Sequence, residues 1–192
     1  DFGPVFYNQS PEAFRDYHHR VAEHAASREV KLISAFTVYR DAGAITHANP
    51  QIRESAYISG LSIIEQAACY GAEFAGLSLF TMNREDSENP DLYRQLFDEG
   101  MAIWKRWMED ARRLGVPRLV VEMAAAHREG CSSIPETRRT LDLLAAHHEA
   151  NPADTAPVCL CYDTGHGISP AESPDDRDRD YKAWLEAFPE ET

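Results

Sequence analysis

Length, composition and charge already exclude several classes of protein. The chain has 192 residues, of which 43% are hydrophobic and 27% charged, so it can form one domain with a sizeable core and is not wholly disordered. Its formal net charge of -13, from 19 Lys and Arg against 32 Asp and Glu, repels phosphate backbones and anionic membranes. No apolar run approaches the roughly 20 residues that span a bilayer. We therefore expect neither nucleic acid nor a membrane as a partner.

The four cysteines indicate a reducing compartment. Cys69, Cys131, Cys159 and Cys161 form no C-x-x-C pair, and no segment resembling a signal peptide precedes them. Reduced thiols in a cytoplasmic protein are the simplest interpretation. Cys159 and Cys161 would share one face of a strand, where small core-filling residues are more common than a C-x-C metal site.

The first half of the chain alternates helix and strand. Ser10, Pro11 and Glu12 mark a helix start, with a capping hydroxyl, a proline in the first turn and an acid beside it. Gly71 is a plausible stop for the second helix. The periodicity of apolar residues predicts a helix over 10–28, a strand over 30–37, a polar loop over 38–50, a helix over 52–70 and a strand over 73–81.

The second half continues the same alternation. Gly115 and Pro117 end a long helix, and Ser133 with Glu136 has the spacing of a capping box at the start of the next one. After a polar loop, MNREDSENPD, the pattern predicts a helix over 91–114, a strand over 118–123, a helix from 133, a strand over 156–163 and a helix over 178–188.

This alternation predicts an α/β fold with a parallel sheet, since parallel neighbours need a return connection about as long as a helix. An open doubly wound sheet and an arc of a (β/α)8 barrel both satisfy it. No G-x-G-x-x-G motif follows any strand, which favours the barrel. A whole barrel takes about 250 residues. We therefore expect one partial TIM-barrel domain over residues 1–192, covering the central strands 3 to 6.

Two of the predicted strands end in acids. Glu122 lies at the end of RLVVEM and Asp163 at the end of VCLCYD, one βα unit further on. The carboxyl ends of barrel strands surround the active site, so the two carboxylates would share one mouth. Two carboxylates in a partly dry cavity repel unless a proton or cation separates them, and Mg²⁺ or Mn²⁺ suits such oxygen ligands. The alternative is that each acid caps a turn or pairs with an arginine.

Several other polar residues follow the strands. His166 comes three residues after Asp163, and Gly165 between them allows a sharp turn that would bring the imidazole to the same mouth. His47 and His127 also lie in loops that follow strands, although a loop histidine alone is more often structural. Arg40, Arg84 and Arg128 are candidate phosphate contacts, although surface arginine is the commoner explanation.

LVVEM followed by CLCYDTGHG resembles strands five and six of the xylose isomerase-like TIM barrels, which include sugar and sugar-phosphate isomerases and epimerases. VKLISAFT and EFAGLSLFT match strands three and four in order, so the resemblance covers essentially the whole chain. Among these proteins, those acting on four-carbon ketose phosphates are the nearest in overall character.

The resemblance implies roles for three residues. Glu122 and Asp163 would bind the divalent metal, Mn²⁺ or Mg²⁺ with Zn²⁺ and Co²⁺ as alternatives, and Glu122 would also be the proton-transfer base. His166 would contact a substrate oxygen. The family completes its metal site with a histidine and a glutamate on strands seven and eight, and neither strand is present in these 192 residues.

The expected activity is a metal-dependent isomerisation or epimerisation of a small sugar or sugar phosphate. Such a reaction removes a proton next to a carbonyl and passes through an enediolate, which a carboxylate base and a Lewis acid can support. Two alternatives stay open: a zinc phosphoesterase of the endonuclease IV type, which has a similar Asp-Thr-x-His strand end, and a non-catalytic barrel used for binding. The oligomeric state is also open, with a homo-oligomer among the options.

Overall fold

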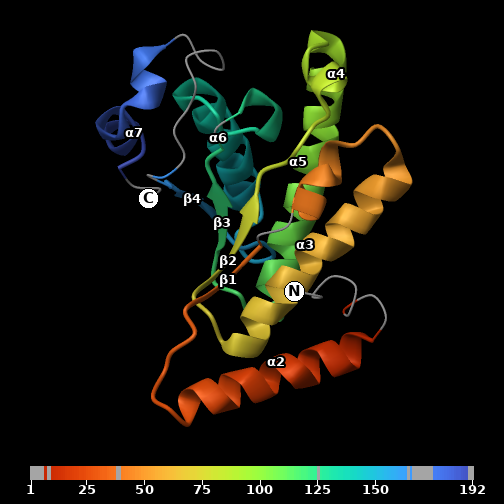
Figure 1. Cartoon of the computed structure of the whole chain (residues 1–192), viewed down its shortest axis with the longest axis vertical. Coiled ribbons are helices and arrows are strands. Elements are labelled where there is room, and N and C mark those ends of the chain that lie inside the picture. The colour runs from red at the N-terminus through yellow and green to blue at the C-terminus, as the bar shows by residue number, and fades with distance from the viewer. Residues whose placement is uncertain are drawn as a thin grey trace.

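A parallel four-stranded sheet forms the centre of the computed structural model, which describes residues 7, 10–37, 40–124, 126–163, 165 and 175–189 (Figure 1). The strands follow one another across the sheet in chain order. They are β1 (Ser34–Phe36), β2 (Phe74–Ser78), β3 (Leu119–Glu122) and β4 (Val158–Cys161). The α/β class and the parallel pairing predicted from the sequence are confirmed.

Helices connect the strands and flank the sheet. The α-helices are α2 (Pro11–Ala26), α3 (Pro50–Tyr70), α4 (Arg84–Ser87), α5 (Pro90–Leu114), α6 (Ile134–Ala150) and α7 (Tyr181–Ala187). The 3-10 helices are η1 (Arg40–Thr46), η2 (His127–Glu129) and η3 (Asp176–Arg179). Over the part of the chain that the structure describes, none of these helices combines the length and the apolar character that crossing a bilayer demands.

The helix boundaries follow from local chemistry. The side chain of Ser10 accepts a hydrogen bond from the backbone N–H of Ala13 at the start of α2, as a capping residue does. Gly71 and Gly115 end α3 and α5 in the left-handed conformation, with φ of 58° and 78°, where glycine has no steric penalty. These predicted starts and stops are confirmed.

The capping box before α6 is confirmed only in part. The Ser133 hydroxyl accepts from the backbone N–H of Glu136, as predicted. The return bond differs, because the Glu136 carboxylate accepts from the backbone N–H and the hydroxyl of Ser132. A polar side chain one position earlier therefore competes successfully for the glutamate.

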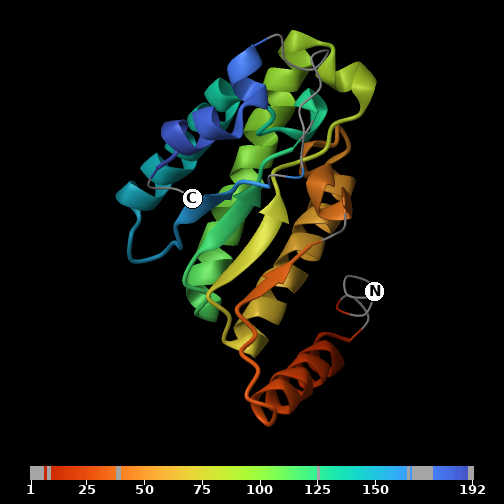
Figure 2. The same cartoon turned by 60° about the vertical axis from the view of Figure 1, so that its left-hand side comes forward.

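The arrangement of the helices favours a barrel arc over a doubly wound sheet. Helices α3, α5 and α6 all lie on the same side of the sheet (Figure 2). In a doubly wound sheet the strand order reverses at a switch point and helices cover both faces, whereas right-handed crossovers that always progress in one direction keep the helices on one face. The progressive order β1-β2-β3-β4 is of the second kind.

The face of the sheet toward the helices is the densely packed one. Its side chains are at most 4% exposed and alternate with the residues of the other face: Ala75, Leu77, Leu119, Val121 and Leu160. They join one hydrophobic core with side chains from the three covering helices, among them Ile64, Trp104 and Leu144. Burial of this face stabilises the arc at roughly 25 cal/mol for each Å² of apolar surface.

The opposite face is the inner surface of the arc and is more open. Phe36, Phe74, Ser78, Glu122 and Cys161 point to this side and are all only half-buried. In parallel sheets that are covered on both faces, strands consist almost wholly of apolar residues. The polar residues on this face therefore mark it as the side where chemistry can occur.

Two predicted loops contain short helices. The segment predicted as a polar loop over 38–50 includes η1, in which Ile45 is 0% exposed and belongs to the core. The loop after β2 includes α4, capped by the Asn83 side chain on the backbone N–H of Asp86. Both segments are polar on average, but η1 is ordered by buried side chains, Ile45 and Thr46, and α4 by its capping residue.

Gly60 allows α3 and α5 to approach closely, which gives a stability prediction. A methyl group at Gly60 would lie 2.2 Å from Cζ2 of Trp107, a fully buried ring whose Nε1–H donates to the Tyr57 carbonyl at 3.0 Å. Gly60→Ala gains about 1 kcal/mol of helix propensity, but overpacking costs about 1–3 kcal/mol. Because the ring is anchored, we expect a net loss in the free energy of unfolding measured with urea.

Ser55→Ala, on an exposed part of the same helix, is the matched control for Gly60→Ala and should change stability by less than about 0.5 kcal/mol. If Gly60→Ala were more stable than the wild type, the close packing of α3 on α5 described above would be wrong.

Candidate active site

The carboxyl ends of β2, β3 and β4 bring three polar side chains into one row. The register pairs Ser78 with Glu122 and Glu122 with Cys161. Paired residues on parallel strands point to the same face, which here is the inner face. Asp163 lies two residues beyond Cys161 along the chain. The row therefore places both predicted acids at the same mouth of the arc.

The charges of both acids affect the pKa of the Cys161 thiol. Its pKa is raised by burial first, and then by the negative charges of Glu122 and of Asp163. Burial disfavours the charged thiolate, and two neighbouring carboxylates disfavour it further. We infer that Cys161 stays a neutral thiol and does not act as a nucleophile, in agreement with the packing role expected from the sequence.

Asp163 also stabilises the turn that follows β4. Its Oδ1 accepts a hydrogen bond of 2.7 Å from the backbone N–H of Gly165. This is a local aspartate turn, so Asp163 caps a turn, which was the alternative to metal binding for this acid. A carboxylate accepts several hydrogen bonds or ligands at once, and a turn that fixes its orientation does not compete with metal binding. His166, the predicted substrate contact, lies outside the described residues.

Ser78 is a polar residue of the mouth that sequence reasoning missed. Its Oγ is buried and has no hydrogen-bond partner. A buried polar group without a partner costs about 1–3 kcal/mol, so native structures contain few of them. The available signal was a hydroxyl near the end of the apolar run EFAGLSLFT, but a single serine in a strand is common.

The next layer of side chains along the strands, on the same face, is apolar. Phe36 pairs with Gly76 in the register, and its ring occupies the space that a side chain at Gly76 would fill, 2.0 Å from the Cβ position. Val120 and Cys159 continue the same layer on β3 and β4. The acids of the mouth therefore lie above an apolar layer, which lowers the local dielectric and strengthens the interactions of charged groups there.

The two other candidate histidines have local partners. The backbone N–H of Asn49 donates to Nδ1 of His47 at 2.9 Å, which orders the turn before α3. The ring of His127 stacks on Tyr93 with centroids 4.8 Å apart, and its Nδ1 lies 3.7 Å from the Glu136 carboxylate. Each histidine has a structural role where it lies.

Two of the three candidate phosphate contacts lie beside acidic side chains. Arg84 pairs with Glu88 within an exposed part of the chain, at 2.7 Å, and Arg128 lies 3.7 Å from Glu129. The side chain of Arg40 lies outside the described residues. A phosphate site built on these arginines stays a prediction.

A metal site cannot be completed from the described residues alone. Over the ranges the structure describes, no group of three or more His, Cys, Asp and Glu residues could hold a metal ion. The carboxylates of Glu122 and Asp163 supply hard oxygen donors, the donor type that Mg²⁺ and Mn²⁺ prefer. The pair fits part of such a site, and the metal itself stays a prediction.

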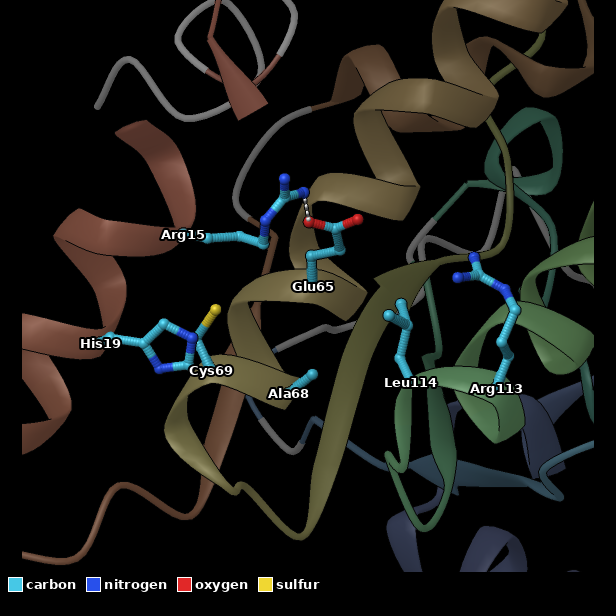
Figure 3. Close-up of a pocket in the computed structure, with 7 residues that line it drawn as sticks. All are labelled: Arg15, His19, Glu65, Ala68, Cys69, Arg113 and Leu114. Atoms are coloured by element: carbon cyan, nitrogen blue, oxygen red, sulfur yellow. Dashed lines mark hydrogen bonds and ion pairs between the residues drawn. The ribbon is translucent and has the colours of Figure 1, made fainter. Parts of the chain in front are cut away.

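A pocket of about 400 Å³ lies at the other end of the strands (Figure 3). It is bordered by Arg15 and His19 of α2, by Cys69 near the end of α3 and by Arg113 near the end of α5. These helix ends immediately precede β2 and β3, so the pocket lies away from the mouth. In barrels, the amino-terminal end of the strands contributes to stability and the carboxyl end carries the chemistry.

The polar contacts beside this pocket attach α2 to α3. The buried carboxylate of Glu65 accepts from Arg15 at 3.1 Å and from the Tyr7 hydroxyl at 2.9 Å. The pKa of Tyr7 is raised, mainly by burial and then by this hydrogen bond to Glu65. The Glu65 carboxylate and its two donors, the Arg15 guanidinium and the neutral Tyr7 phenol, form a structural cluster. We do not place the active site here.

A progressive parallel sheet with its helices on the outside and its acids at the carboxyl ends defines an arc of a (β/α)8 barrel. The sequence matches no family model, and no curated protein matches it. Solved structures, however, have the same fold, and two of them are described as a xylose isomerase and a xylose isomerase domain protein. The resemblance seen in the sequence is thus confirmed at the level of the fold.

Three of these structures show the extent of the likeness. A xylose isomerase-like protein from Rhodospirillum rubrum has a TM-score of 0.80 and 17% identity, over 93% of this chain and 58% of its own. A xylose isomerase domain protein from Planctomyces limnophilus has a TM-score of 0.60 and 12% identity, over 93% and 57%. The 3-keto-D-glucoside 4-epimerase of E. coli has a TM-score of 0.60 and 16% identity, over 92% and 62%. The chain thus spans less than two thirds of each.

Proposed function

We propose that the protein is a divalent-metal-dependent isomerase or epimerase of a small sugar or sugar phosphate. The observation that carries this proposal is the position of Glu122 and Asp163 at the carboxyl ends of adjacent parallel strands, where Glu122 is paired with Cys161 and Asp163 follows two residues later. The fold shared with a 3-keto-D-glucoside 4-epimerase supports the same class of reaction.

The same proposal extends to the arrangement of the chain. The strands β1 to β4 would correspond to strands 3 to 6 of a barrel, with residues 1–192 forming part of a single domain. The remaining metal ligands would then come from strands seven and eight. The four cysteines are free thiols, which agrees with a cytoplasmic location.

Each residue has a separate task in the reaction. Glu122 takes the proton from the carbon next to the carbonyl, which leaves an enediolate, and its return of that proton to the neighbouring carbon on the same face gives the isomer. Epimerisation would need a second acid on the opposite face to protonate the enediolate, because Glu122 lies on one face only. Asp163 and Glu122 would hold the cation, Mn²⁺ or Mg²⁺ with Zn²⁺ and Co²⁺ as alternatives. When bound, this ion supplies Lewis-acid stabilisation of the developing negative charge. His166 would donate a hydrogen bond to a substrate oxygen.

No observation favours the two alternatives over this proposal. An endonuclease IV-like phosphoesterase needs a basic surface for DNA, and the net charge of -13 opposes one. A non-catalytic barrel has no need of two converging acids, because burying two like charges is costly without a cation or a proton between them.

Proton exchange with solvent tests the reaction directly. The protein is incubated in D₂O with Mn²⁺ or Mg²⁺ and a panel of ketoses and ketose phosphates, and the products are followed by NMR. We expect deuterium at the carbon next to the carbonyl of one substrate, together with its isomer or epimer. If every ketose and ketose phosphate stayed unchanged, the proposed function would be wrong.

Metal binding gives an independent prediction. Replacing Asp163 by Asn keeps the size of the side chain but removes its charge, so we expect the affinity for Mn²⁺ to fall more than about 100-fold, beyond the effect of losing an outer-shell contact. Isothermal titration calorimetry measures this change. Asp154→Asn, on an exposed residue before β4, is the matched control and should bind like the wild type. Equal affinity of Asp163→Asn and wild type would remove Asp163 from the site.

A further inference from the structure

Ser78 has the position of a residue that supports Glu122. It lies at the last residue of β2, and the register pairs it directly with Glu122 on β3. Neighbouring strands are about 4.8 Å apart, so the two side chains start from adjacent points on the same face. Over the described residues, the pairing of β1 with β2 ends two residues earlier, at Phe36 and Gly76, and Glu122 is the paired neighbour of Ser78 there.

The hydroxyl of Ser78 needs a partner that can reach a buried atom. Its Oγ is buried and unpartnered, although a serine hydroxyl can donate one hydrogen bond and accept two. A dissolved ligand cannot touch an atom that has no accessible surface, but the side chain next to it can turn onto it. Among the described residues, the other buried side-chain atoms without a geometric hydrogen bond are Thr137 Oγ1 and His147 Nε2, both of α6, and His147 Nε2 lies 3.9 Å from the Glu109 carboxylate.

We propose that Ser78 is a positioning residue for Glu122: its hydroxyl donates a hydrogen bond to the Glu122 carboxylate when that carboxylate turns to bind the metal. This inference rests on the proposed function. Metal-binding carboxylates are usually held by hydrogen bonds from an outer shell, and these bonds fix the orientation of the ligand. A bond to a charged acceptor is about twice as strong as a neutral one, so Glu122 is the acceptor that best satisfies this hydroxyl.

The unpaired hydroxyl favours a state in which the Glu122 carboxylate has turned toward it. A hydroxyl left without a partner in the free protein destabilises that state relative to one in which the hydrogen bond is made. Within the described strands, the side chains of Phe36 and Val120 in the layer beneath the row carry no hydrogen-bond acceptor. Metal binding and the orientation of Glu122 are therefore coupled through Ser78.

The test measures Mn²⁺ affinity by calorimetry for the wild type, Ser78→Ala and Ser78→Thr. We expect Ser78→Ala to bind Mn²⁺ about 10–100-fold more weakly, the usual effect of losing an outer-shell partner, while Ser78→Thr keeps a hydroxyl and most of the affinity. Ser62→Ala is the matched control, because Ser62 is a buried serine whose hydroxyl already donates to the Ser59 carbonyl at 2.7 Å within α3. It should bind Mn²⁺ like the wild type.

A thermal melt of the metal-free proteins gives a readout that does not depend on metal. Removing a hydroxyl that has no partner should leave the melting temperature of Ser78→Ala equal to or above that of the wild type. A clear fall would mean that the hydroxyl already has a partner in the free protein, which would overturn the inference.

The calorimetry separates the two proposals. If the wild type binds Mn²⁺ and Ser78→Ala binds it equally well, the role of Ser78 is wrong and the proposed function stands. If the wild type binds neither Mn²⁺ nor Mg²⁺, the metal-dependent function fails, and the role of Ser78 fails with it.

Discussion

Replacing Glu122 by Gln is expected to lower turnover about 10²–10⁴-fold, the range that general-base catalysis contributes. Glutamine keeps the shape of the side chain and one oxygen donor, but it cannot accept a proton at neutral pH. Because Glu122 lies at the end of β3 beside the thiol of Cys161, no other side chain of its strand can replace it. The rate of deuterium incorporation from D₂O and kcat for the isomer or epimer measure the loss.

The control for Glu122→Gln is the same substitution at Glu149, which is exposed on α6. Glu149→Gln should have the kcat of the wild type. Glu149→Gln should also melt at the wild-type temperature within error, and Glu122→Gln should melt no lower than the wild type, since it removes one of two neighbouring negative charges and no buried apolar surface. Turnover of Glu122→Gln within about tenfold of the wild type would exclude Glu122 as the base, because a missing base costs more than that.

Replacing Trp104 by Ala is expected to lower the free energy of unfolding by about 3–5 kcal/mol, the usual cost of deleting a large core side chain. Trp104 is 0% exposed and joins α5 to the sheet, since its Nε1–H donates to the Leu79 carbonyl at 2.9 Å just beyond β2. It also meets Trp107 edge to face, with ring centroids 5.3 Å apart. The substitution leaves both a cavity and an unpaired buried carbonyl. Urea denaturation measures the change.

Two further variants separate these contributions. Trp104→Phe keeps most of the apolar volume and loses the hydrogen bond, so it should be intermediate between wild type and Trp104→Ala. Tyr181→Ala removes an aromatic ring that is 52% exposed on α7 and should cost much less. A loss below about 1 kcal/mol for Trp104→Ala would contradict the central position of this side chain in the core, because core truncations cost more than that.

Most of the fold could be predicted from the sequence because its signals are local. Helix α3 was predicted over 52–70 and spans Pro50–Tyr70, with Gly71 as its stop. The strands are shorter than predicted: the run over 30–37 forms a strand only at Ser34–Phe36. Residues outside that core have the composition of a strand, but a strand also needs a paired neighbour, and β1 has one only along part of β2.

The candidate site could be predicted only where it depends on strand ends. The positions of Glu122 and Asp163 follow from the rule that the carboxyl ends of parallel strands meet, and the effect of both charges on the pKa of Cys161 agrees with it. Ser78 could not be found in this way, because its proposed role comes from the register that sets it beside Glu122 and from the burial of its hydroxyl. Register and burial are properties of the packed sheet.

The progressive strand order also has a consequence for how the chain folds. Each strand pairs only with the strands that precede and follow it in the sequence, so no pairing in the described sheet has to wait for a distant segment. Such pairing means that only short segments of chain have to be closed into loops during folding. The ribosome also synthesises the amino-terminal units first. Nascent chains can therefore add one unit at a time, from β1 toward β4. Asp163 follows the last of these strands, so it joins Glu122 only when the arc is otherwise assembled.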